Sequence, residues 1–177
     1  MFDPSERESR FRTMYVAHYS AMSAFAVRRL ASPDDVADTV AEVFTVAWRR
    51  LETIPDPPED RLWLYGVARR VVADNHRGST RRQNLLNRLT SQRVGVAPHA
   101  SAPDAIHEHV LESIGVLRPV DREALLLVAW DGLSHAEAAQ VLGCSVNAIG
   151  IRVHRAKARL RAVLAACEPS TPKLTRD

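Results

Sequence analysis

The sequence predicts an all-α protein with two small helical domains joined by a flexible linker, the C-terminal domain carrying a helix-turn-helix. Apolar residues recur at helical spacing in both halves of the chain, and no stretch of any length alternates as a β-strand does. Between the halves, residues 79–104 lose this periodicity and become rich in polar residues, then in glycine and proline. We therefore place the domains at residues 11–78 and 105–166, with a linker at residues 79–104 and a disordered tail at residues 167–177.

Composition excludes several classes of protein. The 177 residues are 46% hydrophobic, which is ample for cores. No apolar run approaches the length of a membrane span and the N-terminus is too polar for a signal peptide, so we expect a soluble cytoplasmic protein without membrane insertion. Cys144 and Cys167 lack the spacing of zinc or redox motifs, so neither a metal nor a cofactor is expected. The net charge of +3 is small, so the placement of the charges matters more than their sum.

The first two helices are predicted at residues 11–30 and 33–51. The first has a core pattern, and the polar residues 1–10 before it are expected to fray. The second has a strong start, because Ser32 can cap its N-terminus, Pro33 suits the first helical position and two aspartates follow. Its buried stripe is expected to consist of Val36, Val40, Val43, Phe44, Ala47 and Leu51.

A second, polar stripe runs along the same helix. Its members, at positions i, i+4, i+7 and i+11, are Asp38, Glu42, Thr45 and Arg49. Such a stripe is either a solvated face or a docking surface for another protein, and the spacing alone favours the solvated face. Trp48 lies beside it, and a large aromatic residue near a polar stripe often marks an interface.

A rigid loop and a basic helix follow. Residues 54–60, with the sequence IPDPPED, contain three prolines and form what we call the proline loop. The next helix is predicted at residues 61–76, where six arginines on the helix and just beyond it accompany one acidic residue, Asp74. With Trp63 and Tyr65 near the start, this composition is typical of a surface that binds single-stranded nucleic acid. The alternative is that both aromatic residues belong to the core and the arginines are solvated.

The C-terminal domain is predicted to hold helices at residues 105–117 and 120–131, followed by two helices joined through a tight turn. Ser134 can cap the first of this pair, and Glu137 closes a capping box. Gly143 ends that helix, and Ser145 caps a last helix at residues 146–164. This is the spacing of a helix-turn-helix, whose second helix lies in the major groove of DNA. The core of residues 120–131 is expected to include Leu125, Leu126, Val128, Ala129 and Trp130.

The last helix has the charge that DNA binding requires. Residues 146–161 hold five lysines or arginines and no acidic residue, a balance that favours contact with phosphates. Asparagine and arginine on the exposed face, among them Asn147 and Arg152, are able to contact base edges. The alternative interpretation is a solvated basic face on a plain helical hairpin.

Three stretches together resemble the short bacterial sigma factors of the extracytoplasmic-function (ECF) group of the sigma-70 superfamily. These stretches are DDVADTVAEVFTVAWRRL, RLWLYGVARRVVADNHRG and LRPVDREALLLVAWDGLSHAEAAQVLGCSVNAIGIRVHRAKARLR. The resemblance covers about residues 11–163. It implies sigma region 2 at residues 11–78, sigma region 4 at residues 105–166, and a subunit that directs core RNA polymerase to promoters and assists strand opening.

The resemblance also implies roles for single residues. For docking on the β′ clamp of core RNA polymerase it implies Asp38, Glu42, Phe44, Trp48 and Arg49. For the −10 element and its displaced strand, where the proline loop would capture an unstacked base, it implies Ile54, Asp56, Asp60, Trp63, Arg69, Arg70, Asn75 and Arg77. For the −35 element it implies Ser145, Asn147, Ala148, Arg152, His154 and Arg155. Further implied partners are promoter DNA, the β flap of the polymerase and an anti-sigma factor that occludes both domains.

Two positions depart from the family pattern. Arg70 stands where the family usually has asparagine, so contacts with the displaced strand differ there. Gly150 stands on the last helix where a longer polar residue is common. Because glycine offers no side chain, direct base contacts shift to neighbouring residues or give way to recognition of DNA shape.

Two other functions compete with this interpretation. A stand-alone transcriptional regulator would bind duplex DNA through the same helix-turn-helix and would not need polymerase. An enzyme would need an organised site, yet Asp38 with Glu42 is only a carboxylate pair, and the chain has no HExxH motif and no glycine-rich phosphate loop. The sequence therefore predicts a DNA-binding protein that is not an enzyme.

Overall fold

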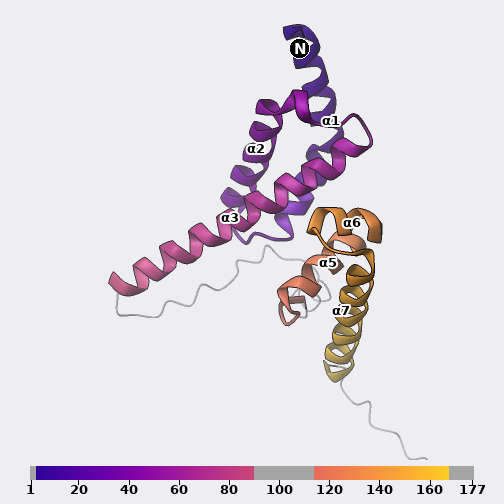
Figure 1. The fold of residues 1–177 in the computed structure, drawn as a ribbon. Helices are drawn as coiled ribbons and strands as arrows, with labels where there is room; N and C mark the ends of the chain where they lie inside the picture. Colours follow the sequence, from indigo (N-terminus) through magenta and orange to yellow (C-terminus); the bar gives the residue numbers. More distant parts are fainter. Residues whose placement is uncertain (1–2, 90–113, 168–177) are drawn as a thin grey trace, which may run out of the picture. The chain divides into compact units, whose positions relative to one another are not determined.

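Every regular element of the computed structural model is helical within residues 3–89 and 114–167, the two ranges that the structure describes. The predicted all-α class is thereby confirmed. The chain divides into two compact units, Met1–Ala100 and Ser101–Asp177. Figure 1 shows the first unit with α1 (Pro4–Val27), α2 (Pro33–Arg49), one turn of 3₁₀-helix, η1 (Leu51–Thr53), and α3 (Glu59–Leu89). The second unit contains α5 (Pro119–Ala129), α6 (His135–Leu142) and α7 (Val146–Cys167).

Helix α1 begins earlier than predicted. Asp3 caps it, Pro4 takes the first helical position, and the backbone N–H of Asp3 donates to the Glu6 carboxylate at 3.3 Å. These are the residues of a helix start, because proline needs no partner for a missing N–H and an acidic residue suits the positive end of the helix dipole. The expectation that residues 1–10 fray is therefore wrong for residues 4–10.

Helix α2 follows its predicted start. The Ser32 hydroxyl accepts from the backbone N–H of Asp35 at 3.4 Å, and Pro33 occupies the first position. The helix ends at Arg49, two residues before the predicted end, and the chain tightens into η1, which buries Leu51. Apart from the half-buried Val36, the predicted apolar stripe is buried, and Thr39 is buried with it.

Helix α3 is longer than predicted. It begins at Glu59 and continues to Leu89, past the expected end at residue 76 and into the predicted linker. No proline or glycine interrupts residues 79–89, and their arginines, leucines and glutamine are good helix formers. Residues 90–104 of the predicted linker, residues 105–113 of the next predicted helix and residues 168–177 of the predicted tail lie outside the described ranges.

The core of the first unit lies where α1, α2 and α3 pack against one another. Phe25 of α1 and Tyr65 of α3 are both fully buried and meet edge to face, with ring centroids 5.6 Å apart. Tyr65 is thus a core residue, as one of the two interpretations of the basic helix expected, whereas Trp63 is only half-buried. The other large apolar side chains buried there include Met14, Met22, Val43, Leu51, Ile54 and Leu64.

The second unit packs α5 and α6 against α7. Ile149, Val153 and Ala156 of α7 recur at helical spacing and are buried, whereas Val146 is half exposed. The predicted core of α5 is partly wrong, since Trp130 is 43% exposed and Ala129 is also exposed. The helix ends at Ala129, and its buried face consists of Asp121, Ala124, Leu125, Leu126 and Leu127.

The turn between α6 and α7 has the predicted caps. The Ser134 hydroxyl accepts from the N–H of Glu137 at 3.2 Å, and the Glu137 carboxylate accepts from the N–H of Ser134 at 2.7 Å. Gly143 then turns left-handed at φ 63°, and the Ser145 hydroxyl accepts from the N–H of Ala148 at 3.2 Å. Both helix starts and the tight turn are therefore satisfied by local hydrogen bonds.

Two glycines of this unit are expected to respond oppositely to alanine. Gly150 is helical and a Cβ there would meet no atom within 4 Å, so Gly150→Ala should stabilise the unit by about 0.4–1 kcal/mol. Gly143→Ala should destabilise it by about 1 kcal/mol, because alanine is strained at φ 63° even where space is open. Urea unfolding beside wild type measures both changes, and a destabilised Gly150→Ala variant would contradict the open helical geometry.

Candidate functional site

The polar stripe of α2 is an exposed surface. Asp38, Glu42 and Arg49 are exposed, Thr45 is half-buried, and Trp48 beside them is 39% exposed. The Trp48 ring is held in place, because the Arg7 guanidinium lies 4.8 Å from its centroid and Arg7 Nη2 donates to the Trp48 carbonyl at 3.0 Å. Phe11 also meets this ring edge to face at 5.1 Å.

Phe44 is a core residue rather than a surface contact. It is only 4% exposed, as expected for the buried stripe of α2, so it supplies no exposed surface for the docking role that the resemblance implies. Its ring centroid lies 6.3 Å from that of Phe11, 4.6 Å from that of Tyr15 and 6.3 Å from that of Tyr19. We call these four rings with Trp48 the aromatic cluster. Phe44 forms its floor, while Tyr15, Tyr19 and Trp48 are 38–45% exposed.

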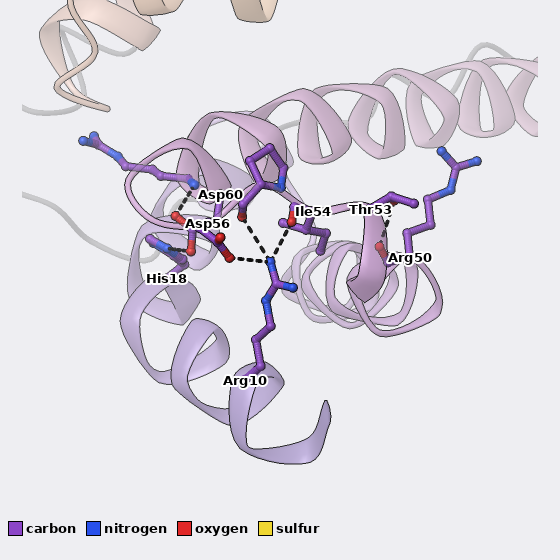
Figure 2. A network of polar contacts seen from close by, with 9 residues as sticks. Arg10, His18, Arg50, Thr53, Ile54, Asp56 and Asp60 are labelled. Carbon is purple, nitrogen blue, oxygen red and sulfur yellow. Dashed lines mark hydrogen bonds and ion pairs between the residues drawn. The ribbon is translucent and has the colours of Figure 1, made fainter. Parts of the chain in front are cut away.

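The proline loop is fastened to α1 by two side chains (Figure 2). Arg10 Nη2 donates to the Ile54 carbonyl at 2.6 Å and to Asp56 Oδ1 at 3.0 Å. At the end of the loop, His18 Nε2 lies 3.0 Å from Asp60 Oδ2, and Asp60 Oδ1 accepts from the Arg61 N–H at 2.8 Å.

Two of the three predicted base contacts in the loop point inward. The Ile54 side chain is 4% exposed and belongs to the core, and Asp60 is 4% exposed and is used by His18 and the start of α3. Asp56 remains exposed on the loop surface. The loop can therefore meet a nucleotide through Asp56 and the prolines, while Ile54 and Asp60 fix its shape.

The basic surface of α3 is partly free and partly engaged. Arg69 and Arg70 are exposed, Trp63 is half-buried, and Arg77 is exposed and paired with Asp74. Asn75 donates from Nδ2 to the Thr39 hydroxyl at 2.6 Å, a bond that joins α3 to α2. The Asn75 side chain is half-buried, so its amide uses part of its hydrogen-bonding capacity within the fold rather than for contact with a DNA strand.

A groove of about 820 Å³ runs between α1 and the proline loop. Its α1 wall includes Arg10, Thr13 and His18, and its other wall is the loop from Ile54 to Pro58 with Asp60 and Arg61. The volume is ample for a nucleobase, and the mixture of apolar walls with a few polar groups is typical of a ligand site.

Helix α7 presents the predicted residues of the DNA-binding helix along an exposed face. Asn147, His154 and Arg155 are exposed, Ala148 is half-buried, and Ser145 serves as the cap. Arg152 is half-buried, and its Nη1 lies 3.5 Å from Cys144 Sγ in the turn. The basic residues that extend this exposed face are Lys157, Arg159 and Arg161.

Sequence reasoning missed Arg7, Arg10 and His18, which all lie on α1. Their partners stand 41–46 residues further along the chain, and no spacing rule links them. The cap signal from Asp3 to Glu6 could have shown that the first two are helical, but not what they contact.

Among the described residues, no group of His, Cys, Asp or Glu gathers as a metal site, and no helix there is long and apolar enough to cross a membrane.

Comparison with known families decides the class of protein. The model of Sigma-70 region 2 matches residues 14–82, and the model of Sigma-70, region 4 matches residues 107–160. Together they cover more than half of the sequence. The chain belongs to the sigma-70 family. Region 2 corresponds to the first unit, and the α6–α7 pair is the helix-turn-helix of region 4.

Relatives in this family extend over most of the chain. The sigma factor CnrH of Cupriavidus metallidurans is 34% identical over 84% of each chain, and the ECF sigma factor SigL of Mycobacterium tuberculosis is 27% identical over 86% of this chain and 88% of its own. The solved CnrH in complex with the cytosolic domain of CnrY has a TM-score of 0.67 at 28% identity, over 89% of this chain and 88% of that one. The sigma factor RpoE of Bartonella quintana, solved with the anti-sigma factor NepR, matches in fold, with a TM-score of 0.71 at 23% identity over 89% and 98%.

The predicted resemblance is confirmed: the chain is an RNA polymerase sigma factor of the ECF group. It directs core RNA polymerase to promoters and assists their opening. The family is one of initiation factors rather than enzymes. A stand-alone regulator is not favoured, because the match includes region 2 as well as the helix-turn-helix.

The aromatic cluster supplies a test of which rings support the fold. Phe44→Ala is expected to lower the free energy of unfolding by about 3–5 kcal/mol, because it leaves a cavity under three rings. Trp48→Ala should lower it by about 1 kcal/mol, since that ring is already partly exposed. Urea unfolding followed by circular dichroism compares them, and equal losses would contradict the assignment of Phe44 as the buried floor.

Proposed function

We propose that this sigma factor divides promoter recognition among three surfaces. The α2 stripe with Trp48 binds core polymerase, the proline loop with α3 binds the displaced strand of the −10 element, and α7 binds the −35 duplex. The observation that carries the proposal is the geometry of α6 and α7. Their caps and the Gly143 turn bury one face of α7 and leave its basic face in solvent.

The −35 surface is supported by the charge and exposure of α7. Arg155, Lys157, Arg159 and Arg161 lie along the exposed side, where each can meet a phosphate. Asn147, near the start of the helix, is the exposed residue best suited to a base edge, because helix-turn-helix proteins contact bases through the first turns of the second helix.

The polymerase surface is supported by the way Trp48 is held. A partly exposed aromatic ring that is fixed by Arg7 and Phe11 loses little freedom on binding, which is the property of an interface anchor. Asp38, Glu42 and Arg49 supply charges around it for the β′ clamp. In the second unit, the exposed apolar residues Val116, Val120 and Trp130 are our candidates for contact with the β flap.

The single-strand surface is supported by α3 and the groove beside the loop. Arg69 and Arg70 are exposed cations for the strand backbone, and the half-buried Trp63 offers a ring for stacking. The groove of about 820 Å³ next to Asp56 has room for an unstacked base. Arg77 contributes charge, and Asn75 contributes through the bond that holds α3 on α2.

An anti-sigma factor is the regulatory partner that we propose. CnrH and RpoE, whose folds this chain shares, were solved in complex with CnrY and with the anti-sigma factor NepR. An analogous protein would cover the polymerase and DNA surfaces until it is released. We place these events in the cytoplasm, where core polymerase and the chromosome are found.

Run-off transcription tests the whole proposal. Core polymerase alone and core polymerase with the purified chain are incubated with a library of duplexes carrying random −35 and −10 segments, and transcribed templates are recovered. Promoter-specific transcripts that need the chain are the expected result. If the chain bound particular duplexes without polymerase and never supported transcription, the division among three surfaces would be refuted.

The docking surface predicts a specific loss of polymerase affinity. Trp48→Ala should weaken binding to core polymerase by about thirtyfold or more, since a central aromatic anchor contributes about 2 kcal/mol or more. Fluorescence anisotropy of labelled chain measures this affinity. Arg12→Ala, which changes an exposed side chain of α1 paired with Glu8, is the matched control and should leave the affinity unchanged.

The −35 surface predicts a change in salt dependence. With Arg155→Ala, holoenzyme binding to a promoter duplex should weaken, and the slope of log affinity against log salt should fall by about 1, because one phosphate contact is lost. Binding of the variant to core polymerase should stay at the wild-type level. An unchanged slope together with unchanged promoter affinity would remove Arg155 from the DNA surface.

A further inference from the structure

The proline loop has few hydrogen-bond donors of its own. Three of its seven residues, Pro55, Pro57 and Pro58, have no N–H. At its two ends, the Ile54 N–H donates to the Leu51 carbonyl at 3.4 Å and the Glu59 N–H donates to the Asp56 carbonyl at 3.1 Å. Neither of these bonds uses the carbonyl of Ile54 or Pro55, and both of these carbonyls accept from α1 instead.

Arg10 is the donor that the loop uses. Its Nη2 lies 2.6 Å from the Ile54 carbonyl, 3.5 Å from the Pro55 carbonyl and 3.0 Å from Asp56 Oδ1. The side chain is 22% exposed, whereas that of Asp56 is 88% exposed. The guanidinium thus lies under the loop and contacts its first three residues, as Figure 2 shows.

A second contact fixes the other end of the loop. His18 stands eight residues after Arg10, about 12 Å further along α1. Its Nε2 meets Asp60 Oδ2 at 3.0 Å, and both side chains are largely buried, at 15% and 6% exposed. Asp60 also accepts from the Arg61 N–H, at the start of α3. One helix therefore holds both ends of the loop.

We propose that Arg10 is a positioning residue for −10 recognition, which presets the loop in the shape that captures an unstacked base. The inference rests on the proposed role of the loop in capture. A loop that already has its bound shape loses less conformational freedom when the base enters, so affinity for the correct strand rises. Arg10 acts through the loop, because its guanidinium is already occupied by loop acceptors.

The rival role for Arg10 is a direct contact with a DNA phosphate. The two roles predict different effects of the base sequence of the strand on its affinity. A phosphate contact strengthens binding to every strand equally and contributes about 1 to the salt slope. A positioning role strengthens only the strand with the correct base, and it needs the planar fork of arginine rather than its charge alone.

The experiment uses holoenzyme and a labelled single strand that carries the −10 sequence selected by wild-type holoenzyme, beside a scrambled strand. Anisotropy gives the affinity of each strand for wild type, Arg10→Ala, Arg10→Lys and the control Arg12→Ala. We expect Arg10→Ala and Arg10→Lys to lose about tenfold for the selected strand and little for the scrambled one. The salt slope, the affinity for core polymerase and the circular dichroism spectrum should match wild type.

Each outcome separates the proposals. Equal losses for both strands by Arg10→Ala, with a lower salt slope and recovery in Arg10→Lys, would establish a phosphate contact and overturn the positioning role. Unchanged discrimination in both variants would overturn it as well. If wild-type holoenzyme itself did not distinguish the two strands, the proposed capture of a base by the loop would be refuted, whatever the role of Arg10. If circular dichroism shows that an Arg10 variant has lost its helical structure, His18→Gln takes its place. This substitution weakens the contact at the far end of the loop, and it is expected to reduce the preference for the selected strand in the same way.

Discussion

The packing of α1 against α2 and α3 is the interaction on which the region 2 unit depends. It buries Phe25 against Tyr65 at one point and Phe44 under the aromatic cluster at another. The same helix then serves two functional surfaces, because Arg7 holds Trp48 and Arg10 holds the proline loop. Each ring pair in such a cluster contributes about 0.5–1.5 kcal/mol beyond its buried area. A helix that looks merely structural by its sequence therefore sets the geometry of Trp48 and of the proline loop, on which the proposed polymerase and single-strand surfaces depend.

The region 4 unit is organised differently, by interactions between near neighbours. Ser134 with Glu137, Gly143 and Ser145 all act within a few residues of where they stand. They fix where α6 ends and where α7 begins, and the burial of Ile149 and Val153 then decides which face of α7 is exposed. The caps thus determine both helix starts, while the packing of α7 against α5 and α6 selects its buried face.

This difference explains how much could be predicted from the sequence. The start of α2 and the whole helix-turn-helix follow from serine caps, prolines and one glycine, whose preferences are local. The partners of Arg10 and His18 could not be predicted, because a contact across more than 40 residues has no periodic signature. Helical spacing placed Phe44 correctly in the buried stripe of α2, and only the docking role implied by the family resemblance put it on the surface. Trp130 was misplaced, because helical spacing assigns a stripe but not its depth, and a ring at the end of α5 reaches solvent.

The departure at Gly150 bears on how this sigma factor selects promoters. Gly150 offers no side chain, the exposed Ile151 beside it is apolar, and Arg152 is partly engaged with Cys144. The first turns of α7 thus leave few groups for base edges, while four cations further along can meet phosphates. Phosphate contacts position the duplex and carry no sequence information directly. In the proposed division of surfaces, discrimination then comes largely from DNA shape and from a base captured by the proline loop, so the contacts that hold this loop on α1 matter for promoter selection.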